Sequence, residues 1–164
     1  MADPKYPGNG YEDQFPGDEY APWDEEREGP YHRPRPSEPK QVIVMRKDLG
    51  MRKGKMIAQG AHASMKVLLD RMPQTTDGDF VITRTTPALT SWLTGRFTKV
   101  CVSVSSEADL VRVYEAAKAA GLLCAMITDA GLTEFKGVPT LTCCAIGPAM
   151  PEEIDPITGD LKLL

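Results

Sequence analysis

Apolar and polar positions along residues 41–164 fall into blocks that predict strands separated by helices. Apolar and β-branched runs, which are typical of buried strands, occur at 41–45, 99–104, 122–128 and 140–146. Apolar residues recur with helical spacing over 53–70 and again between Ser106 and Gly121. This order predicts an α/β fold in a single domain, with helices on both faces of the sheet.

Capping residues mark a further short helix. Thr86 and Pro87 supply an N-cap and a first-turn proline for a helix that runs through Trp92 and is stopped by Gly95. The last residues, 154–164, are expected to form a tail that turns at Thr158-Gly159.

Residues 1–40 differ from the rest of the chain in composition. They contain eight of the fourteen prolines, many acidic residues and no aliphatic run. Such a segment cannot bury enough apolar area to offset the entropy lost on ordering, so we predict a disordered tail. Two roles remain open: a solvated tether, or a segment whose aromatic residues bind an unknown partner.

Charge is unevenly distributed along the chain. The net charge of −4 hides ten acidic against five basic residues in 1–40, and seven basic against two acidic residues in 41–72. The start of the folded part is therefore predicted to present a basic surface, and the overall negative charge does not exclude a nucleic-acid partner.

One polar stripe marks the long helix over 53–70. Lys55, Gln59, His62 and Lys66 follow the spacing i, i+4, i+7, i+11, which places them within roughly 60° of one another on the helix. A solvated face would normally be wider and richer in charge pairs. The narrow stripe favours a functional rim over an ordinary surface.

Basic residues cluster where this helix begins. The segment contains two glycines and five basic side chains: Arg46, Lys47, Arg52, Lys53 and Lys55. Free backbone amides and the helix dipole favour an anion there, so the segment is either a phosphate-binding element or a solubilising loop. It lacks the P-loop pattern.

A carboxylate and a hydroxyl follow the third predicted strand. Asp129 stands at its carboxyl end and Thr133 four residues later. If the first and third strands are parallel, both residues share a rim with Lys55, where α/β sheets place their sites. The alternative for Asp129 is a turn residue before Gly131.

Several other chemistries are disfavoured. The four cysteines show no metal-binding or disulfide spacing and are expected to be buried free thiols. A serine or cysteine triad would depend on His62 alone, because His32 lies in the tail. We expect no metal and no cofactor. No apolar run is long enough for a membrane span, so a soluble, cytoplasmic protein is expected.

Four motifs together resemble the peptidyl-tRNA hydrolase 2 family: VMRKDLGMRKGKMIAQGAHA (44–63), DAGLT (129–133), AIGP (145–148) and DPITGDLKL (155–163). The resemblance covers 41–164. It implies a four-stranded mixed sheet with helices on both faces, a homodimer, and metal-free hydrolysis of the ester that joins a peptide to the 3′ ribose of tRNA.

The resemblance also implies residue roles. Catalytic positions match Lys55, Asp129 and Thr133, and supporting positions match Gln59 and His62. We expect tRNA to be bound by basic residues around them: Arg46, Lys47, Arg52, Lys53 and Lys66. The chain departs from the family at Arg52, where glycine is usual, and at Lys47, which makes the loop more basic.

The chemistry is expected to be simple, because an ester can be cleaved by positioned water and charge stabilisation. Asp129 would orient or deprotonate the water, and Thr133 would fix its geometry. Lys55 would stabilise an oxyanion or hold a phosphate. His62 either transfers a proton or is only hydrogen-bonded. The rivals are a tRNA-binding module that has lost turnover and a small-molecule esterase.

Overall fold

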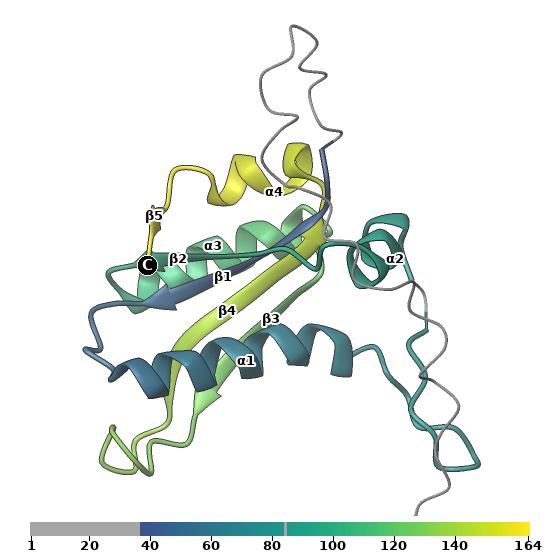
Figure 1. Ribbon diagram of the computed structural model, residues 1–164. Coiled ribbons are helices and arrows are strands. Elements are labelled where there is room, and N and C mark those ends of the chain that lie inside the picture. The colour runs from purple at the N-terminus through teal and green to yellow at the C-terminus, as the bar shows by residue number, and fades with distance from the viewer. Residues whose placement is uncertain (1–36, 84) are drawn as a thin grey trace, which may run out of the picture. The chain divides into compact units, whose positions relative to one another are not determined.

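The computed structural model describes residues 37–83 and 85–164 (Figure 1). Residues 1–36 of the predicted tail lie outside the described residues. The elements follow the order β1 (Lys40–Arg46), α1 (Lys53–Leu69), α2 (Pro87–Thr94), β2 (Lys99–Val104), α3 (Glu107–Ala119), β3 (Cys124–Asp129), β4 (Thr140–Ala149), α4 (Pro151–Thr158) and β5 (Lys162–Leu163). The predicted tail thus overlaps β1 at Lys40.

The strands form one mixed sheet in the order β3-β4-β1-β2-β5. β1 and β2 are parallel, whereas β4 pairs antiparallel with both β1 and β3. β1 and β3 therefore run in the same direction, as the predicted shared rim requires. Their carboxyl ends lie at the same edge of the sheet.

The prediction of four strands is wrong by one. β5 pairs antiparallel with β2, with Val102 opposite Leu163 and Ser103 opposite Lys162. Two residues are too few to show a strand pattern in the sequence. The first five residues of the expected tail, 154–158, also belong to a helix, α4, which begins at Pro151, a favourable first-turn position, and ends at the predicted turn.

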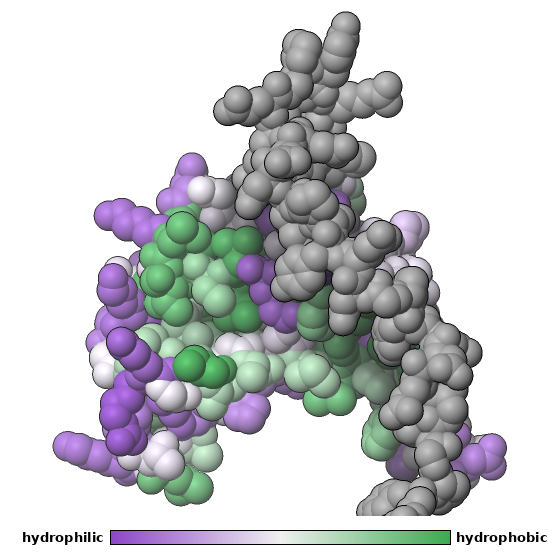
Figure 2. Space-filling model, in the orientation of Figure 1, coloured by the Kyte–Doolittle hydropathy of each residue, from purple (hydrophilic) through white to green (hydrophobic). Residues whose placement is uncertain are grey.

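Part of the sheet face beside α1 is left open. α1 lies over β3, β4 and β1, and none of the described helices covers the part of the face toward β2 and the C-terminus (Figure 1). Figure 2 shows apolar residues gathered there. We call this surface, a groove of about 620 Å³, the open apolar face; its residues include Ile57, Ala61, Met65, Phe97, Cys101 and Leu164.

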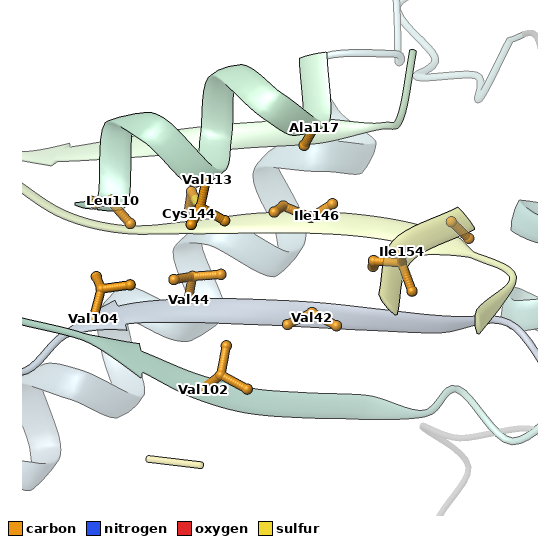
Figure 3. Packing of buried hydrophobic residues seen from close by; sticks show 11 residues of the cluster. Val42, Val44, Val102, Val104, Leu110, Val113, Ala117, Cys144, Ile146 and Ile154 are labelled. Atoms are coloured by element: carbon orange, nitrogen blue, oxygen red, sulfur yellow. The ribbon is translucent and has the colours of Figure 1, made fainter. Parts of the chain in front are cut away.

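Two apolar cores pack against opposite faces of the sheet. One joins β1, β2 and β4 to α3 and α4, with Leu110, Val113 and Ile154 supplied by the helices (Figure 3). The other joins α1 to β1, β3 and β4. Cys143 lies in the second core and Cys144 in the first. The prediction of helices on both faces is confirmed.

Not all cysteines are buried as expected. Cys143 and Cys144 are buried free thiols, Cys124 is half-buried, and Cys101 is exposed. Cys101 is exposed because its β2 position faces the side of the sheet that α1 leaves open. The strand pattern does not reveal which part of a sheet face a helix leaves bare.

The short helix α2 begins as its sequence predicts. The Thr86 hydroxyl accepts a hydrogen bond from the Leu89 amide, and Pro87 occupies the first turn. Trp92 is buried and its indole N–H donates to the Thr98 carbonyl, 2.7 Å away. Among the described helices, none combines the length and apolarity needed to cross a membrane.

Candidate active site

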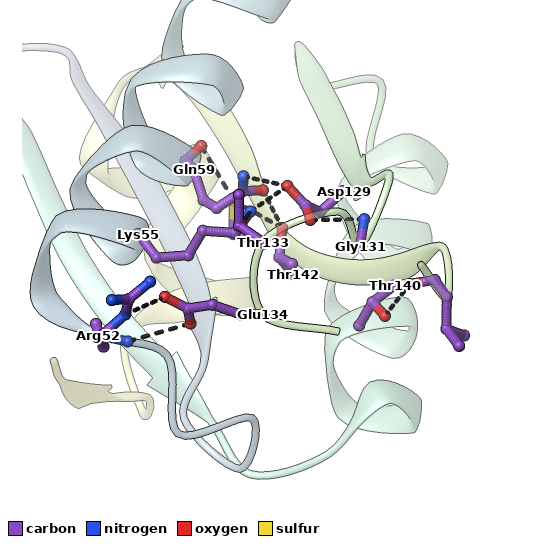
Figure 4. A network of polar contacts seen from close by, with 11 residues as sticks. Arg52, Lys55, Gln59, Asp129, Gly131, Thr133, Glu134, Thr140 and Thr142 are labelled. Carbon is purple, nitrogen blue, oxygen red and sulfur yellow. Dashed lines mark hydrogen bonds and ion pairs between the residues drawn. The ribbon is translucent and has the colours of Figure 1, made fainter. Parts of the chain in front are cut away.

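The beginning of α1 and the loop after β3 bring three predicted catalytic residues together. The Lys55 Nζ atom lies 2.5 Å from Asp129 Oδ2 and 3.2 Å from Thr133 Oγ1 (Figure 4). Both charged side chains are largely buried, with 12% of Lys55 and 14% of Asp129 exposed. The result is a charged pair at the sheet edge, with an exposed hydroxyl beside it.

Asp129 is held by three donors. Besides Lys55, the Gln59 side-chain amide donates to Oδ2 at 2.9 Å, and the Gly131 backbone N–H donates to Oδ1 at 2.9 Å. These contacts favour the ionised carboxyl, and the hydrogen bond from Lys55 does most to hold the pKa of Asp129 below its ordinary value. Asp129 is therefore a carboxylate at neutral pH and a weak base.

A second hydrogen bond holds the Gln59 side chain on the side away from Asp129. Its side chain is buried, and its carbonyl oxygen accepts a 2.5 Å hydrogen bond from the Thr142 hydroxyl on β4. Sequence reasoning missed Thr142. The available signal was a threonine next to the apolar run Cys143–Ile146.

The loop that carries Thr133 depends on a glycine. Gly131 has φ +81°, and a Cβ atom there would lie 2.3 Å from the Val138 carbonyl oxygen. The Gly131 carbonyl also accepts hydrogen bonds from the Phe135 and Gly137 amides. The Asp129 carboxylate accepts a hydrogen bond from the Gly131 amide in this turn, so its expected role as a turn residue applies, and its catalytic role stays a prediction.

Arg52 forms an ion pair across the entrance of the site. Its Nε atom lies 2.7 Å from Glu134 Oε1, and its backbone N–H also points to Glu134 (Figure 4). This bond from Arg52 is the main cause of the lowered pKa of Glu134. Arg52 has φ −62°, so the backbone does not require glycine there. Sequence reasoning missed Glu134.

These residues surround an open hollow of about 390 Å³, lined by Arg52, Gly54, Lys55, Thr133 and Glu134. A carboxylate that accepts hydrogen bonds and an ammonium group at the edge of a hollow can orient water and stabilise negative charge on a bound carbonyl group. This arrangement suits the hydrolysis of an ester.

Comparison with known families identifies the family of the chain. The family model described as Peptidyl-tRNA hydrolase PTH2 matches residues 39–164, which include every residue of the site. The chain belongs to the PTH2 family.

The chain matches related proteins over nearly their whole length. A protein named peptidyl-tRNA hydrolase from Methanocaldococcus jannaschii is 46% identical over 126 residues, 76% of this chain and 99% of that protein. Proteins of the same name from Metallosphaera sedula and Halobacterium salinarum are 42% and 43% identical over 125 residues, 76% of this chain and 99% and 98% of those proteins.

The polar stripe of α1 divides in two around the PTH2 site. Lys55 and Gln59 turn toward Asp129, whereas His62 is exposed and makes no hydrogen bond within the described part of the chain. Lys66 pairs with Asp70 at 2.7 Å near the far end of the helix. The stripe is therefore a site at one end and a solvated rim at the other.

Arg46 does not join the PTH2 site, and its expected contact with tRNA is not supported. It is 8% exposed and donates to Asp48, to Glu107 and to the Leu141 carbonyl. These partners occupy its guanidinium group, so we assign Arg46 a structural role. Lys47, Arg52 and Lys53 are exposed.

Proposed function

We propose that the protein hydrolyses the ester bond between a peptide, or an N-acylated amino acid, and the 3′ ribose of tRNA, and so releases free tRNA. The main support is the Lys55–Asp129 pair beside Thr133, at the edge of an open hollow. Membership of the PTH2 family supports the same reaction. Since this substrate arises in translation, the proposal places the protein in the cytoplasm.

In the proposed mechanism, Asp129 orients the attacking water. Its lowered pKa makes it a weak base, so it accepts a hydrogen bond from water and does not remove the proton in advance. The water oxygen bonds to the ester carbonyl carbon and the ester C–O bond breaks. The water supplies the proton that the released 3′ oxygen takes up. Thr133 fixes the position of the water.

Lys55 supplies positive charge to this reaction. As the carbonyl oxygen gains negative charge, the ammonium group, held in place by Asp129 and Thr133, stabilises it without reorganisation. We propose that this charge takes the part of a metal ion, so that turnover does not depend on divalent cations.

Recognition of tRNA is assigned to exposed basic residues around the hollow. Lys47, Arg52 and Lys53 lie between β1 and the first turn of α1. Contacts with phosphates give affinity with little base information, so binding should be independent of sequence and weaken steeply with salt. An exposed His62 fits a rim contact better than proton transfer at Asp129.

The decisive test is the release of N-acyl-amino acid from N-acyl-aminoacyl-tRNA, at low salt and with a chelator present. Wild type should cleave the ester, and Lys55→Ala and Asp129→Ala should each lose at least about 100-fold in kcat. Tight tRNA binding without cleavage by the wild type would identify a binding module instead. Cleavage of simple esters that tRNA does not inhibit would identify a small-molecule esterase.

A second part of the proposal is that two copies of the chain pair through the open apolar face. Ile57 is 73% exposed, Met65 49% and Phe97 44%, an unusual concentration of large apolar side chains on one surface. The face lies on the side of α1 away from Asp129, so pairing leaves the hollow accessible.

Ile57→Glu combined with Met65→Glu tests this pairing. Sedimentation should show a dimer for the wild type and a monomer for the variant, because two carboxylates would be buried without partners in the interface. Val111→Glu changes an exposed apolar residue on α3 and should leave the dimer intact. A wild-type protein that is monomeric at high concentration would refute the pairing.

A further inference from the structure

The Thr142 side chain lies where the regular alternation of β4 is interrupted. Ile127 pairs with Cys143, but the next residue, Thr128, pairs with Leu141, so Thr142 is an extra residue in this ladder. Such a β-bulge turns side chains away from their regular face, and bulges are common beside active sites.

The bulge directs two neighbouring residues to one residue of α1. The Thr142 hydroxyl donates to the Gln59 side-chain oxygen at 2.5 Å, and the Cys143 thiol donates to the Gln59 backbone oxygen at 3.3 Å. In a regular strand, successive side chains face opposite sides and would not both reach α1. Leu141 packs in the core on the other face.

We infer that Thr142 is a positioning residue, which fixes the orientation of the Gln59 amide so that its NH2 group, and not its oxygen, faces Asp129. In this contact the hydroxyl donates to the Gln59 oxygen. A hydroxyl can also accept, so Thr142 acts together with the ionised Asp129 carboxylate, which can only accept and therefore requires the NH2 group on its side. The amide NH2 group then points to Asp129 Oδ2, 2.9 Å away.

Burial makes this orientation costly to reverse. Thr142 is 0% exposed and Gln59 3% exposed, so water cannot replace a lost partner. A reversed amide would place its oxygen against the Asp129 carboxylate, two acceptors with no proton between them. Without the Thr142 hydroxyl, the amide oxygen would be buried without a donor, which is unfavourable.

The inference rests on the proposed function in one respect, the use of Asp129 to orient water. Thr142 then acts on the reaction only through Gln59 and Asp129. Its loss should change how Asp129 titrates and how fast the ester is cleaved, and should leave tRNA binding unaltered.

Thr142→Val removes the hydroxyl and keeps the side-chain shape, whereas Thr142→Ser keeps the hydroxyl. Thr140→Val is a matched control, because Thr140 lies on the same strand and donates to the Val138 carbonyl instead. The readouts are carboxyl ¹³C titration of Asp129 in the full chain, and kcat and KM with N-acyl-aminoacyl-tRNA. Thermal unfolding checks that each variant is folded.

We expect Thr142→Val to raise the pKa of Asp129 and to lower kcat about tenfold, with KM nearly unchanged. Thr142→Ser and Thr140→Val should resemble the wild type. Thr142→Val should add nothing in a chain that already carries Gln59→Leu.

An unchanged Asp129 titration in folded Thr142→Val would overturn the inference, and so would a Thr142→Ser variant as impaired as Thr142→Val. A shifted titration with unchanged kcat would support the orientation of Gln59 and overturn the proposed role of Asp129. The two proposals can therefore fail separately.

Discussion

Lys55 and Asp129 are 74 residues apart in the sequence, and their side chains meet at 2.5 Å. Lys55 stands in the first turn of the helix after β1, and Asp129 is the last residue of β3. The two strands run in the same direction because each is antiparallel to β4. The topology of the sheet thus brings the two charges to one rim.

Replacing Lys55 with methionine should raise the pKa of Asp129. The Lys55 hydrogen bond stabilises the ionised carboxyl and holds its pKa below 3.8, so removing the ammonium returns the pKa toward that value. Carboxyl ¹³C titration measures the change. Lys53→Met, at an exposed position in the same turn, should leave the titration unaltered. No shift in Lys55→Met would assign the lowered pKa to Gly131 and Gln59.

Gly131→Ala should inactivate the enzyme while the matched Gly137→Ala does not. Both glycines have positive φ, but an added Cβ meets the Val138 backbone at Gly131 and nothing within 4 Å at Gly137. Gly137→Ala should cost about 1–2 kcal/mol of stability from backbone strain. Gly131→Ala should also displace Asp129 and Thr133 and lower kcat at least about 100-fold. Equal kcat values in the two variants would contradict this account.

The fold was predictable where local patterns determine it. The four longer strands and the helices α1, α2 and α3 follow from apolar periodicity and caps such as Thr86. β5 was not predictable, because its two residues form a strand only by pairing with the neighbouring strand β2. α4 was missed because its prolines resemble turn residues, although Pro151 suits the first turn of a helix.

The part of the candidate site that depends on strand direction was predictable. Lys55 and Asp129 follow from a helix start and a strand end at one edge. The direction of the Thr142 side chain depends on a β-bulge. A bulge is set by the register between two strands, and a single sequence does not show that register. The burial of Arg46 was not predictable, because its partner Glu107 lies 61 residues away.

Glu134 should compete with the phosphates of tRNA for the Arg52 side chain. Arg52 is 80% exposed and held by Glu134, so a phosphate must replace that carboxylate to use its charge. Glu134→Gln should tighten tRNA binding, and Arg52→Ala should weaken it and reduce the slope of log K against log salt by about one. Filter binding over a salt series measures both. Glu115→Gln, which breaks an ion pair with Lys118 on α3, is the control and should change neither the affinity for tRNA nor the salt slope.

Alkylation should distinguish the four cysteines. Cys101 is exposed and should react first, whereas burial raises the pKa of Cys143 to about 11 and that of Cys144 further, which suppresses their thiolates. Mass spectrometry after brief treatment with iodoacetamide identifies the labelled residue. Protection of Cys101 that increases with protein concentration is expected if two chains pair through the open apolar face. Rapid labelling of Cys144 in folded protein would contradict the structure.

Arg46→Leu should destabilise the fold and leave tRNA binding unchanged. The variant leaves the Leu141 carbonyl and two carboxylates without their donor, and since Asp48 and Glu107 are partly exposed, water replaces some of the loss. We expect a decrease of about 2 kcal/mol in the free energy of unfolding at pH 7, measured with urea. Lys47→Leu, at the exposed neighbouring position, is the control for stability.

The effect of Arg46→Leu should also depend on pH. The hydrogen bond from Arg46 lowers the pKa of Asp48 below 3.8 in the folded state, so this contribution is complete above that value and is lost as the pH falls through the folded pKa. The difference in stability between wild type and variant should therefore be constant from neutral pH to about pH 5 and decrease in stronger acid. A variant with unchanged stability and weakened tRNA binding would instead return Arg46 to the phosphate-binding surface.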